Sequence, residues 1–470
     1  EDQATGTGQS GLPPKIYSVI RSRLTQLSPE TQTLVNLAAV IGRSFTYNVL
    51  MEASAMGEEE VVDSLDELLE RQIIREQGAD TYDFSHDRIR DVAYNEISRT
   101  RRRLLHRRVA EALETVHRDA LATICGLLAE HHEQAGNVAE AIAYLTRAGD
   151  QATEQFALDD ALHYFERVLT LLPANAYLQR YEMHHKRLRV HKQRLRGEPL
   201  AAELVLFQKL VESHLTLLPN PAQVQAELAL YQAVCTRIQG DFVASVAYAE
   251  QASQMARRAD LLEIEAEALI DWGNTLWSIG DLQQAGLKLY EGAEKAQKVG
   301  RTDLQAKGLE LYAQTGMFSG MSTAEMAGYL QQCLAIHQAN QDLVGQCNIY
   351  NKLGYIQVAE GDGAYANAKP YYIEGIRLAK QFGGIWIEMN LIRNLGFLYV
   401  CEGDHRRAVA TLQDALVRCR QHGVYTHELF SLMTLGYECF NRGDFAPAER
   451  YYTQGLAIAE AVQLAQFWTR

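Results

Sequence analysis

Apolar side chains recur every three or four positions along most of this chain, which is the spacing of amphipathic helices. Between residues 138 and 470 the apolar segments come in pairs, and most pairs are interrupted by a glycine that is usually followed by an aspartate. Nearer the N-terminus, helical spacing gives way to two short runs rich in β-branched and aromatic residues. The pattern therefore predicts an all-α fold with β-structure confined to one hairpin.

Six glycines mark the turns of the paired segments, at intervals of 40, 40, 41, 42 and 40 residues. An aspartate follows five of them, and its carboxylate can accept the free N–H groups at the start of the next helix. One helical hairpin cannot bury its apolar face alone, so a constant period of this size predicts stacked hairpins. The six are Gly240, Gly280, Gly320, Gly361, Gly403 and Gly443.

A small residue stands seven positions before each turn glycine, where we expect the two helices to approach closely. These residues are Ala233, Gly273, Ala313, Gly354, Gly396 and Gly436. Weaker turns near Ala157 and Gly197 extend the series, the former accompanied by Gly149 and Phe165. We therefore expect about eight helical hairpins over 138–470.

The segment Leu435–Phe445, followed by Ala448 and Tyr452, resembles the tetratricopeptide repeat (TPR). The resemblance implies a right-handed superhelix of helical hairpins. The period of about 40 exceeds the usual ~34, which predicts longer helices. The resemblance is weakest where Met321 replaces the aspartate and where Gly363 and Ala364 form a small insertion.

Residues 15–98 form a different unit. Ser28 as N-cap and Pro29 after it predict a helix start, and two more helices are expected over 47–55 and 58–72. The runs 73–77 and 81–84 then flank a turn sequence, which predicts a hairpin. Three helices followed by a hairpin predict a winged-helix domain. Residues 1–14 are expected to be a disordered linker, and 99–137 connecting helices.

Composition narrows the class of protein. A formal charge of −14 disfavours a chain that binds nucleic acid as a whole. Seven cysteines without a C-x-x-C pair indicate reduced structural thiols rather than a disulfide or metal site. The chain has no apolar run of membrane-spanning length and its first residues do not form a signal peptide. We expect a cytoplasmic protein without a membrane partner.

Two charged features bear on nucleic acid. The expected third helix begins with acidic residues 58–60 and would repel phosphate, so we expect no direct nucleic-acid partner. The basic stretches 99–108 and 184–196 are interpreted as solvated helix faces or docking sites for acidic surface, with nucleic acid as the lesser alternative.

Catalytic and metal-binding patterns are poor. His131-His132-Glu133 lacks the H-E-x-x-H spacing of a zinc protease, and no G-x-S-x-G occurs. We interpret His131 and His132 as ordinary helix residues and expect neither catalytic residues nor a metal ligand set. The chain is predicted not to be an enzyme by itself.

The segments Leu37–Phe45 and Phe84–Arg90, with the Arg-rich helix after them, resemble the signal-transducing STAND ATPases, including the MalT-like transcriptional regulators. In that family an ATPase domain precedes a winged helix and a repeat sensor. This chain has no G-x-x-x-x-G-K-[ST] motif. The resemblance therefore implies ATP or ADP only with an upstream domain, and no cofactor here. Because Glu1 is not a methionine, we expect a piece of a longer protein, although processing gives the same end.

The same resemblance assigns a role to His86 and Asp87. Phe84-Ser85-His86-Asp87 occupies the place of the family's Met-His-Asp motif, whose histidine is associated with the ADP-bound resting state. An imidazole N–H can donate to a phosphate oxygen. The structural alternative is that His86 caps the helix after the hairpin and Asp87 lies in its first turn.

The first helix of each TPR unit lines the concave face, and its exposed positions fall 13, 10, 6 and 3 residues before the turn glycine. Amides, one arginine and aromatic rings at these positions favour a polar ligand or an extended peptide. We expect Arg393 to be exposed and level with Asn351, and about half of the wider stripe to be core. The candidate groove residues are Asn274, Trp277, Gln314, Asn348, Asn351, Tyr355, Asn390, Arg393, Phe397 and Tyr437.

Together these features predict the regulatory sensor region of a STAND-type ATPase. A small-molecule inducer or protein partner binds the groove and shifts a nucleotide-dependent switch. The upstream ATPase domain and self-association in the active state are the other implied partners. The alternative is a constitutive TPR scaffold for protein–protein interaction, without a switch.

Overall fold

The computed structural model describes residues 13–78, 80–194, 197–361 and 363–461. It divides into two compact units, Glu1–Arg194 and Leu195–Arg470. The expected linker 1–14 lies outside the described residues, apart from Pro13 and Pro14. Within the described residues, no helix combines the length and apolarity needed to cross a bilayer.

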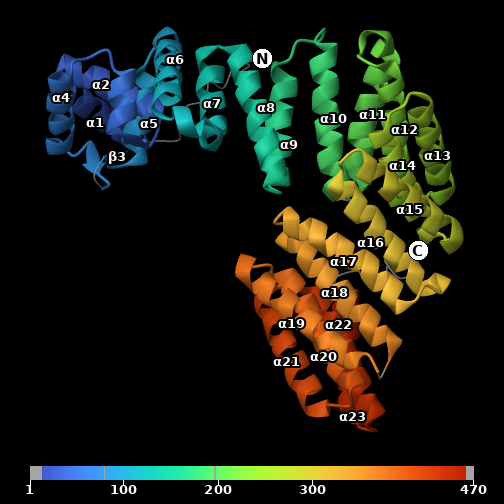
Figure 1. Ribbon diagram of the computed structural model, residues 1–470. Coiled ribbons are helices and arrows are strands. Elements are labelled where there is room, and N and C mark those ends of the chain that lie inside the picture. The colour runs from blue at the N-terminus through green and yellow to red at the C-terminus, as the bar shows by residue number, and fades with distance from the viewer. Residues whose placement is uncertain (1–12, 79, 195–196, 362, 462–470) are drawn as a thin grey trace, which may run out of the picture. The chain divides into compact units, whose positions relative to one another are not determined.

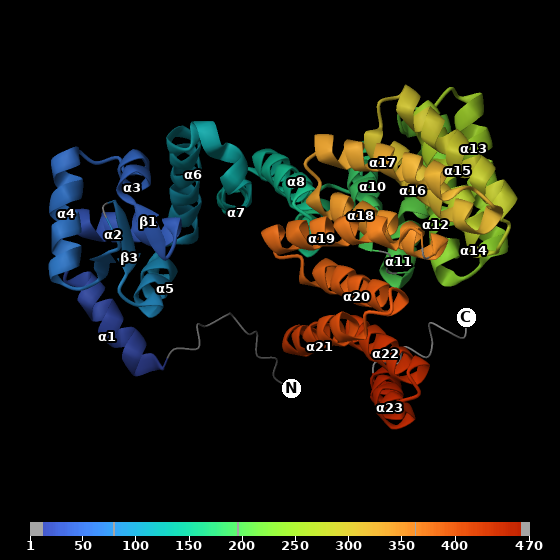
Figure 2. The same cartoon turned by 60° about the horizontal axis from the view of Figure 1, so that its bottom comes forward.

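The first part of the first unit contains the helices and hairpin expected from the sequence, drawn in blue in Figures 1 and 2. A helix over residues 14–25, which was not predicted, precedes them. Ser28 caps the second helix by accepting a hydrogen bond from the Thr31 backbone N–H. Strand β1 was not predicted; it pairs with β3, which also pairs with β2, all antiparallel. The elements are α1 (Pro14–Thr25), α2 (Pro29–Ile41), β1 (Ser44–Thr46), α3 (Tyr47–Ala53), α4 (Glu58–Glu70), β2 (Ile74–Glu76) and β3 (Thr81–Phe84).

Helices α5 (Asp87–Glu96) and α6 (Arg99–Val116) complete this part of the core. Buried Val109 and Leu113 of α6 belong to the same apolar cluster as Phe84 of β3. The Arg-rich helix α6 therefore packs its apolar side on the predicted winged-helix region and leaves its basic side outward.

Buried histidines join α6 to α7 (Cys125–Ala135), which follows a short 3₁₀ segment (Arg118–Ile124). The His106 and His131 Nδ1 atoms are 2.9 Å apart, and the Tyr94 hydroxyl lies 3.0 Å from His106 Nε2. Burial lowers the pKa of His106 to about 4 and that of His131 to about 3. Both rings are therefore neutral near pH 7, and they serve as packing between helices.

The last helices of the first unit are α8 (Val138–Glu154), α9 (Leu158–Leu171) and α10 (Tyr177–Arg194). The basic stretch on α10 faces acidic groups of α8 and α9. Lys186 pairs with Asp150, Arg187 with Glu166 at 2.5 Å, and Arg194 with Asp159 at 2.7 Å. The described part of 184–196 is thus an intramolecular docking surface, one of the two interpretations offered by the sequence.

The second unit is a TPR-like stack of antiparallel helix pairs, running from green to red in Figure 1. Each of the six hairpins from α12 onward in the described residues spans one period of the glycine pattern. The elements are α11 (Gly197–His214), η2 (Leu215–Leu217), α12 (Pro221–Gln239), α13 (Phe242–Arg258), α14 (Leu262–Ser278), α15 (Leu282–Lys298), α16 (Thr302–Ser319), α17 (Thr323–Ala339), α18 (Leu343–Glu360), α19 (Tyr365–Phe382), α20 (Ile385–Cys401), α21 (His405–His422), α22 (Tyr425–Asn441) and α23 (Phe445–Ala461).

The turn glycines all have positive φ, between 71° and 106°, so a side chain there would be strained. Asp241, Asp281 and Asp404 each accept a hydrogen bond from a backbone N–H in the first turn of the next helix. After Met321, Ser322 caps α17 instead, in a reciprocal capping box with Glu325. Asp362 lies outside the described residues.

The predicted close approaches are present. A methyl group added to Gly273 would lie 2.6 Å from Leu289 Cγ, and one added to Gly354 would lie 2.6 Å from the Tyr372 ring. Gly396 meets Leu412 in the same way at 2.7 Å. In each of these three hairpins, a large side chain of the second helix therefore packs against a glycine of the first.

Acid should weaken the first unit. His106 and His131 are neutral when folded but have a pKa near 6.5 when unfolded, so the unfolded chain takes up more protons as pH falls below 6.5. Each such histidine removes up to ~1.4 kcal/mol of stability per pH unit down to its folded pKa. Urea unfolding of the first unit at pH 7 and pH 4.5 measures the loss. The loss should be smaller in His131→Gln, and an equal pH dependence in that variant would contradict the assignment.

Gly354→Ala should destabilise the second unit by ~1–3 kcal/mol, the usual effect of overpacking, because Tyr372 is fully buried against it. The matched control is Gly328→Ala in α17, where no atom lies within 4 Å of the new methyl group. That change should stabilise by up to ~1 kcal/mol through helix propensity. Equal effects of the two substitutions on denaturant midpoints would show that the close approach is unimportant.

Candidate functional site

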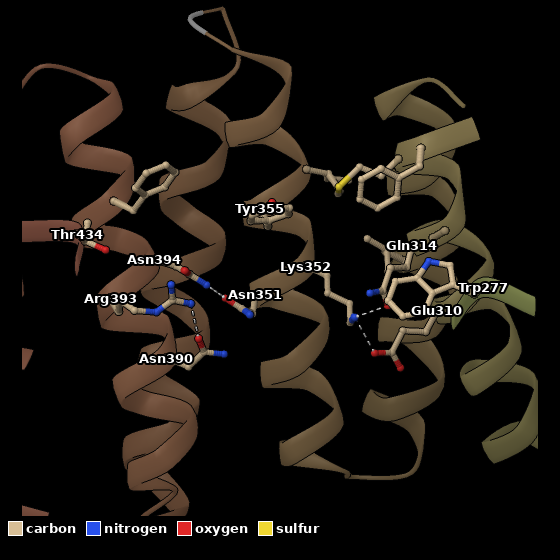
Figure 3. A pocket seen from close by; sticks show the side chains of 16 residues that line it. Trp277, Glu310, Gln314, Asn351, Lys352, Tyr355, Asn390, Arg393, Asn394 and Thr434 are labelled. Atoms are coloured by element: carbon tan, nitrogen blue, oxygen red, sulfur yellow. Dashed lines mark hydrogen bonds and ion pairs between the residues drawn. The ribbon is translucent and has the colours of Figure 1, made fainter. Parts of the chain in front are cut away.

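A pocket of about 600 Å³ lies in the second unit, against the first helices of successive hairpins. Its lining comes mainly from α16, α18 and α20, with Trp277 of α14 and Thr434 of α22 at the margins (Figure 3). These helices alternate in sequence with the second helices α15, α17, α19 and α21. The pocket therefore combines residues about 40 positions apart, as the repeat pattern predicts.

Seven of the ten candidate groove residues line this pocket. The other three lie outside its lining: Asn348 and Tyr437 are exposed, and Asn274 is partly buried. Their role in binding stays a prediction, as does that of the seven. The residues brought together are Trp277, Gln314, Asn351, Tyr355, Asn390, Arg393 and Phe397.

Four polar lining residues were not among the ten candidates: Glu310, Lys352, Asn394 and Thr434. Glu310 lies at one of the predicted offsets, ten residues before Gly320. Lys352 and Asn394 directly follow Asn351 and Arg393 in sequence, so they lie on the same turn of the helix. A stripe one position wider at each of these offsets would have included both. Thr434 follows Met433, which has the same offset in the last repeat.

Arg393 is partly buried, so the prediction that it is exposed is wrong. Its guanidinium carbon lies 5.3 Å from the centre of the Phe430 ring on α22, and that neighbouring helix covers it. Its Nη2 atom donates to Asn390 Oδ1 at 2.8 Å. Its Nε atom is buried and has no hydrogen-bond acceptor in the described part of the chain.

Asn351 does not pair with Arg393 but with the residue after it. Asn394 Nδ2 donates to Asn351 Oδ1 at 2.6 Å, which joins α20 to α18 (Figure 3). The prediction that Asn351 and Arg393 lie at the same height on neighbouring first helices is therefore correct to within one residue. This hydrogen bond uses one N–H of Asn394 and the side-chain oxygen of Asn351. Arg393, which precedes Asn394, therefore has no hydrogen bond to Asn351 of α18.

At the opposite end of the pocket, the positive charge of Lys352 is balanced by the carboxylate of Glu310. Lys352 Nζ of α18 lies 3.4 Å from Glu310 Oε1 of α16 and donates to Gln314 Oε1 at 3.3 Å. Figure 3 shows the lysine reaching between the two helices. Two cations and one carboxylate therefore line the pocket, and the arginine is the charge left without a partner.

Apolar and aromatic side chains make up much of the remaining lining. The apolar and aromatic lining residues include Tyr355, Phe397, Met317, Phe318 and Trp277. Tyr355 keeps 48% of its surface exposed, so its ring is available for contact. Such a mixture of apolar walls and a few polar groups is typical of small-molecule and peptide pockets.

His86 is the N-cap residue of α5, the position given by the structural alternative, although its side chain makes no cap hydrogen bond. Its ring is exposed. Asp87 lies in the first turn of the helix and pairs with Arg43 at 3.0 Å. The two residues therefore lie at the surface of the first unit, where His86 is accessible to another domain.

The basic side of α6 borders a second hollow, of about 1130 Å³. Unlike the cations of α10, its exposed arginines have no carboxylate within salt-bridge distance among the described residues; they are Arg99, Arg101, Arg103 and Arg107. The acidic residues at the start of α4 are exposed, as expected.

Comparison with known proteins agrees with this fold. No protein-family profile matches the chain. An uncharacterized protein of Rhizobium meliloti (strain 1021) is 32% identical over 158 residues, which is 33% of this chain and 15% of that relative. The chain thus spans a small part of the length of the relative it matches.

Among solved structures, a STAND protein with a tetratricopeptide repeat sensor from Pyrococcus horikoshii has a TM-score of 0.58 at 12% identity. The match covers 98% of this chain and 67% of that one. A Rap protein complexed with competence and sporulation factor has a TM-score of 0.46 at 11% identity, covering 69% of this chain and 99% of that one. The first likeness shows that the fold is all-α and TPR-like.

Proposed function

We propose that the chain is a sensor region, and that its pocket binds a small molecule or the end of a peptide. The observation that carries the proposal is the pocket itself: three neighbouring first helices each contribute polar groups to a recess with apolar walls. A recess of this size suits a drug-sized ligand or a few peptide residues. An extended protein segment would also contact the exposed positions at Asn348 and Tyr437.

The pocket suits a sensor because it crosses the joints between hairpins. A ligand that contacts α16, α18 and α20 together favours one spacing of these helices over others. Its differential affinity for that spacing is what shifts a conformational equilibrium. A scaffold that binds a partner constitutively would need no such change, and this is the competing function.

We further propose that the sensor belongs to a STAND-type ATPase, with residues 15–98 of the first unit as a winged-helix module. The fold likeness to the Pyrococcus horikoshii protein and the Phe84–Arg90 segment support this. An ATPase domain upstream would then supply the ATP or ADP site, and exposed His86 would contact the nucleotide. Transcriptional regulation, bacterial origin, a cytoplasmic location and self-association of the active state are parts of the same proposal.

Tyr355→Ala should weaken binding of a ligand found by thermal-shift screening of metabolites and short peptides. Loss of the aromatic contact should cost ~1.5–3 kcal/mol of affinity, measured by calorimetry, with little change in stability because the ring is half exposed. The matched control is Tyr437→Ala, which has the same repeat position and 47% exposure but lies outside the pocket. Equal losses in both variants would argue for an extended groove instead.

His86→Ala in the full-length protein tests the STAND proposal. If the imidazole stabilises an ADP-bound resting state, the variant should lose ADP faster and show higher basal activity. Arg88→Ala, an exposed neighbour on α5, is the control. Unchanged ADP retention and unchanged basal output would leave His86 with a structural role. An upstream sequence without a phosphate-binding loop would contradict the switch altogether.

A further inference from the structure

The least expected feature of the pocket is a guanidinium without a counter-charge. No carboxylate lies within salt-bridge distance of Arg393 in the described part of the chain. One amide oxygen, from Asn390, accepts from Nη2, whereas Nε is buried without an acceptor. The Nη1 atom has no hydrogen-bond partner among these residues. A charge placed in this way costs free energy that an ion pair would offset.

The groups around Arg393 do not replace a counter-ion. Burial lowers the pKa of the guanidinium, opposed by the phenols of Tyr372 and Tyr355. On α22, His427 is buried with neither ring nitrogen bonded, and burial lowers its pKa to about 4, with Arg393 as a second cause. The neighbours are thus neutral, and the positive charge persists at neutral pH.

Replacing such a residue by a neutral one usually improves stability, so its presence indicates a use for the charge. The remaining lining cation, Lys352, is already paired with Glu310. The pocket therefore has a net charge of +1, located at one end of an apolar recess. That arrangement matches one negative charge on a molecule with an apolar or aromatic body.

We propose that the pocket recognises a carboxylate, held end-on by Nη1 and the second hydrogen of Nη2 of Arg393. This inference rests on the proposed function and names its ligand class. A planar guanidinium donates two parallel hydrogen bonds to a carboxylate, and one arginine balances one such charge. A phosphate monoester carries −1.5 to −2 near neutral pH and would leave charge unbalanced. The carboxylate belongs either to a small organic acid or to the C-terminus of a peptide.

The test uses two paired sets of probes on the immobilised full chain. One is a random tetrapeptide library, made as free acids and as C-terminal amides. The other contains aromatic acids such as phenylacetate and indole-3-acetate, with their amides. Mass spectrometry of the retained molecules should show about 10- to 100-fold enrichment of acids over amides, the range for a hydrogen bond to a charged group. The set in which enrichment occurs identifies the source of the carboxylate.

Arg393→Gln should abolish the preference for acids, and Arg393→Lys should retain part of it through one donor. Arg406→Gln is the control and should retain it, because that arginine is exposed on α21 and lies outside the pocket lining. The ligand-free Arg393→Gln protein should melt at the same or a higher temperature than the wild type. A lower melting temperature with an unchanged preference for acids would place Arg393 in the scaffold and overturn the inference.

The outcomes separate this inference from the proposed function. Retention of acids and amides alike, reduced by Tyr355→Ala, would contradict the carboxylate and leave the pocket as a binding site. No retention that depends on Tyr355 in either set would overturn both. Because the preference for acids over amides is measured first in the wild-type protein, the test does not depend on how well any variant folds.

Discussion

Close packing between the two helices of each hairpin is the constraint on which the second unit depends. Gly273, Gly354 and Gly396 leave no room for a methyl group, because a leucine or tyrosine of the second helix fills the space. Interiors packed at this density allow few alternative arrangements. The repeated contact therefore fixes the separation of the helices and, through the turn glycines, the direction of the next one.

The pocket follows from that geometry. Because the hairpins share one period and one kind of glycine turn, their first helices present corresponding positions to the same side, and residues about 40 apart meet. The Asn351–Asn394 hydrogen bond and the Lys352–Glu310 ion pair both join neighbouring first helices. Polar contacts of this kind set the spacing of α16, α18 and α20, which is also what a bound molecule would change.

The repeat was readable from the sequence because glycine at positive φ and a small residue at a close approach are each required by backbone sterics. The polar residues of the pocket lie within one position of the predicted offsets, since offsets along a helix follow from its period, although three of the ten candidates lie outside the lining. The burial of Arg393 could not be predicted from these offsets, because it depends on contact with Phe430 of the next hairpin. Strand β1 was missed for a similar reason: it is three residues long and is defined by pairing with β3.

The central claim is that three first helices together hold one ligand. Hydrogen–deuterium exchange of the full chain, with and without a retained carboxylic acid at saturating concentration, tests it directly. The account predicts added protection in the middle of α16, α18 and α20, where Gln314, Asn351 and Arg393 lie. Protection confined to α6 and α7, or spread evenly over the exposed faces of α22 and α23, would contradict it.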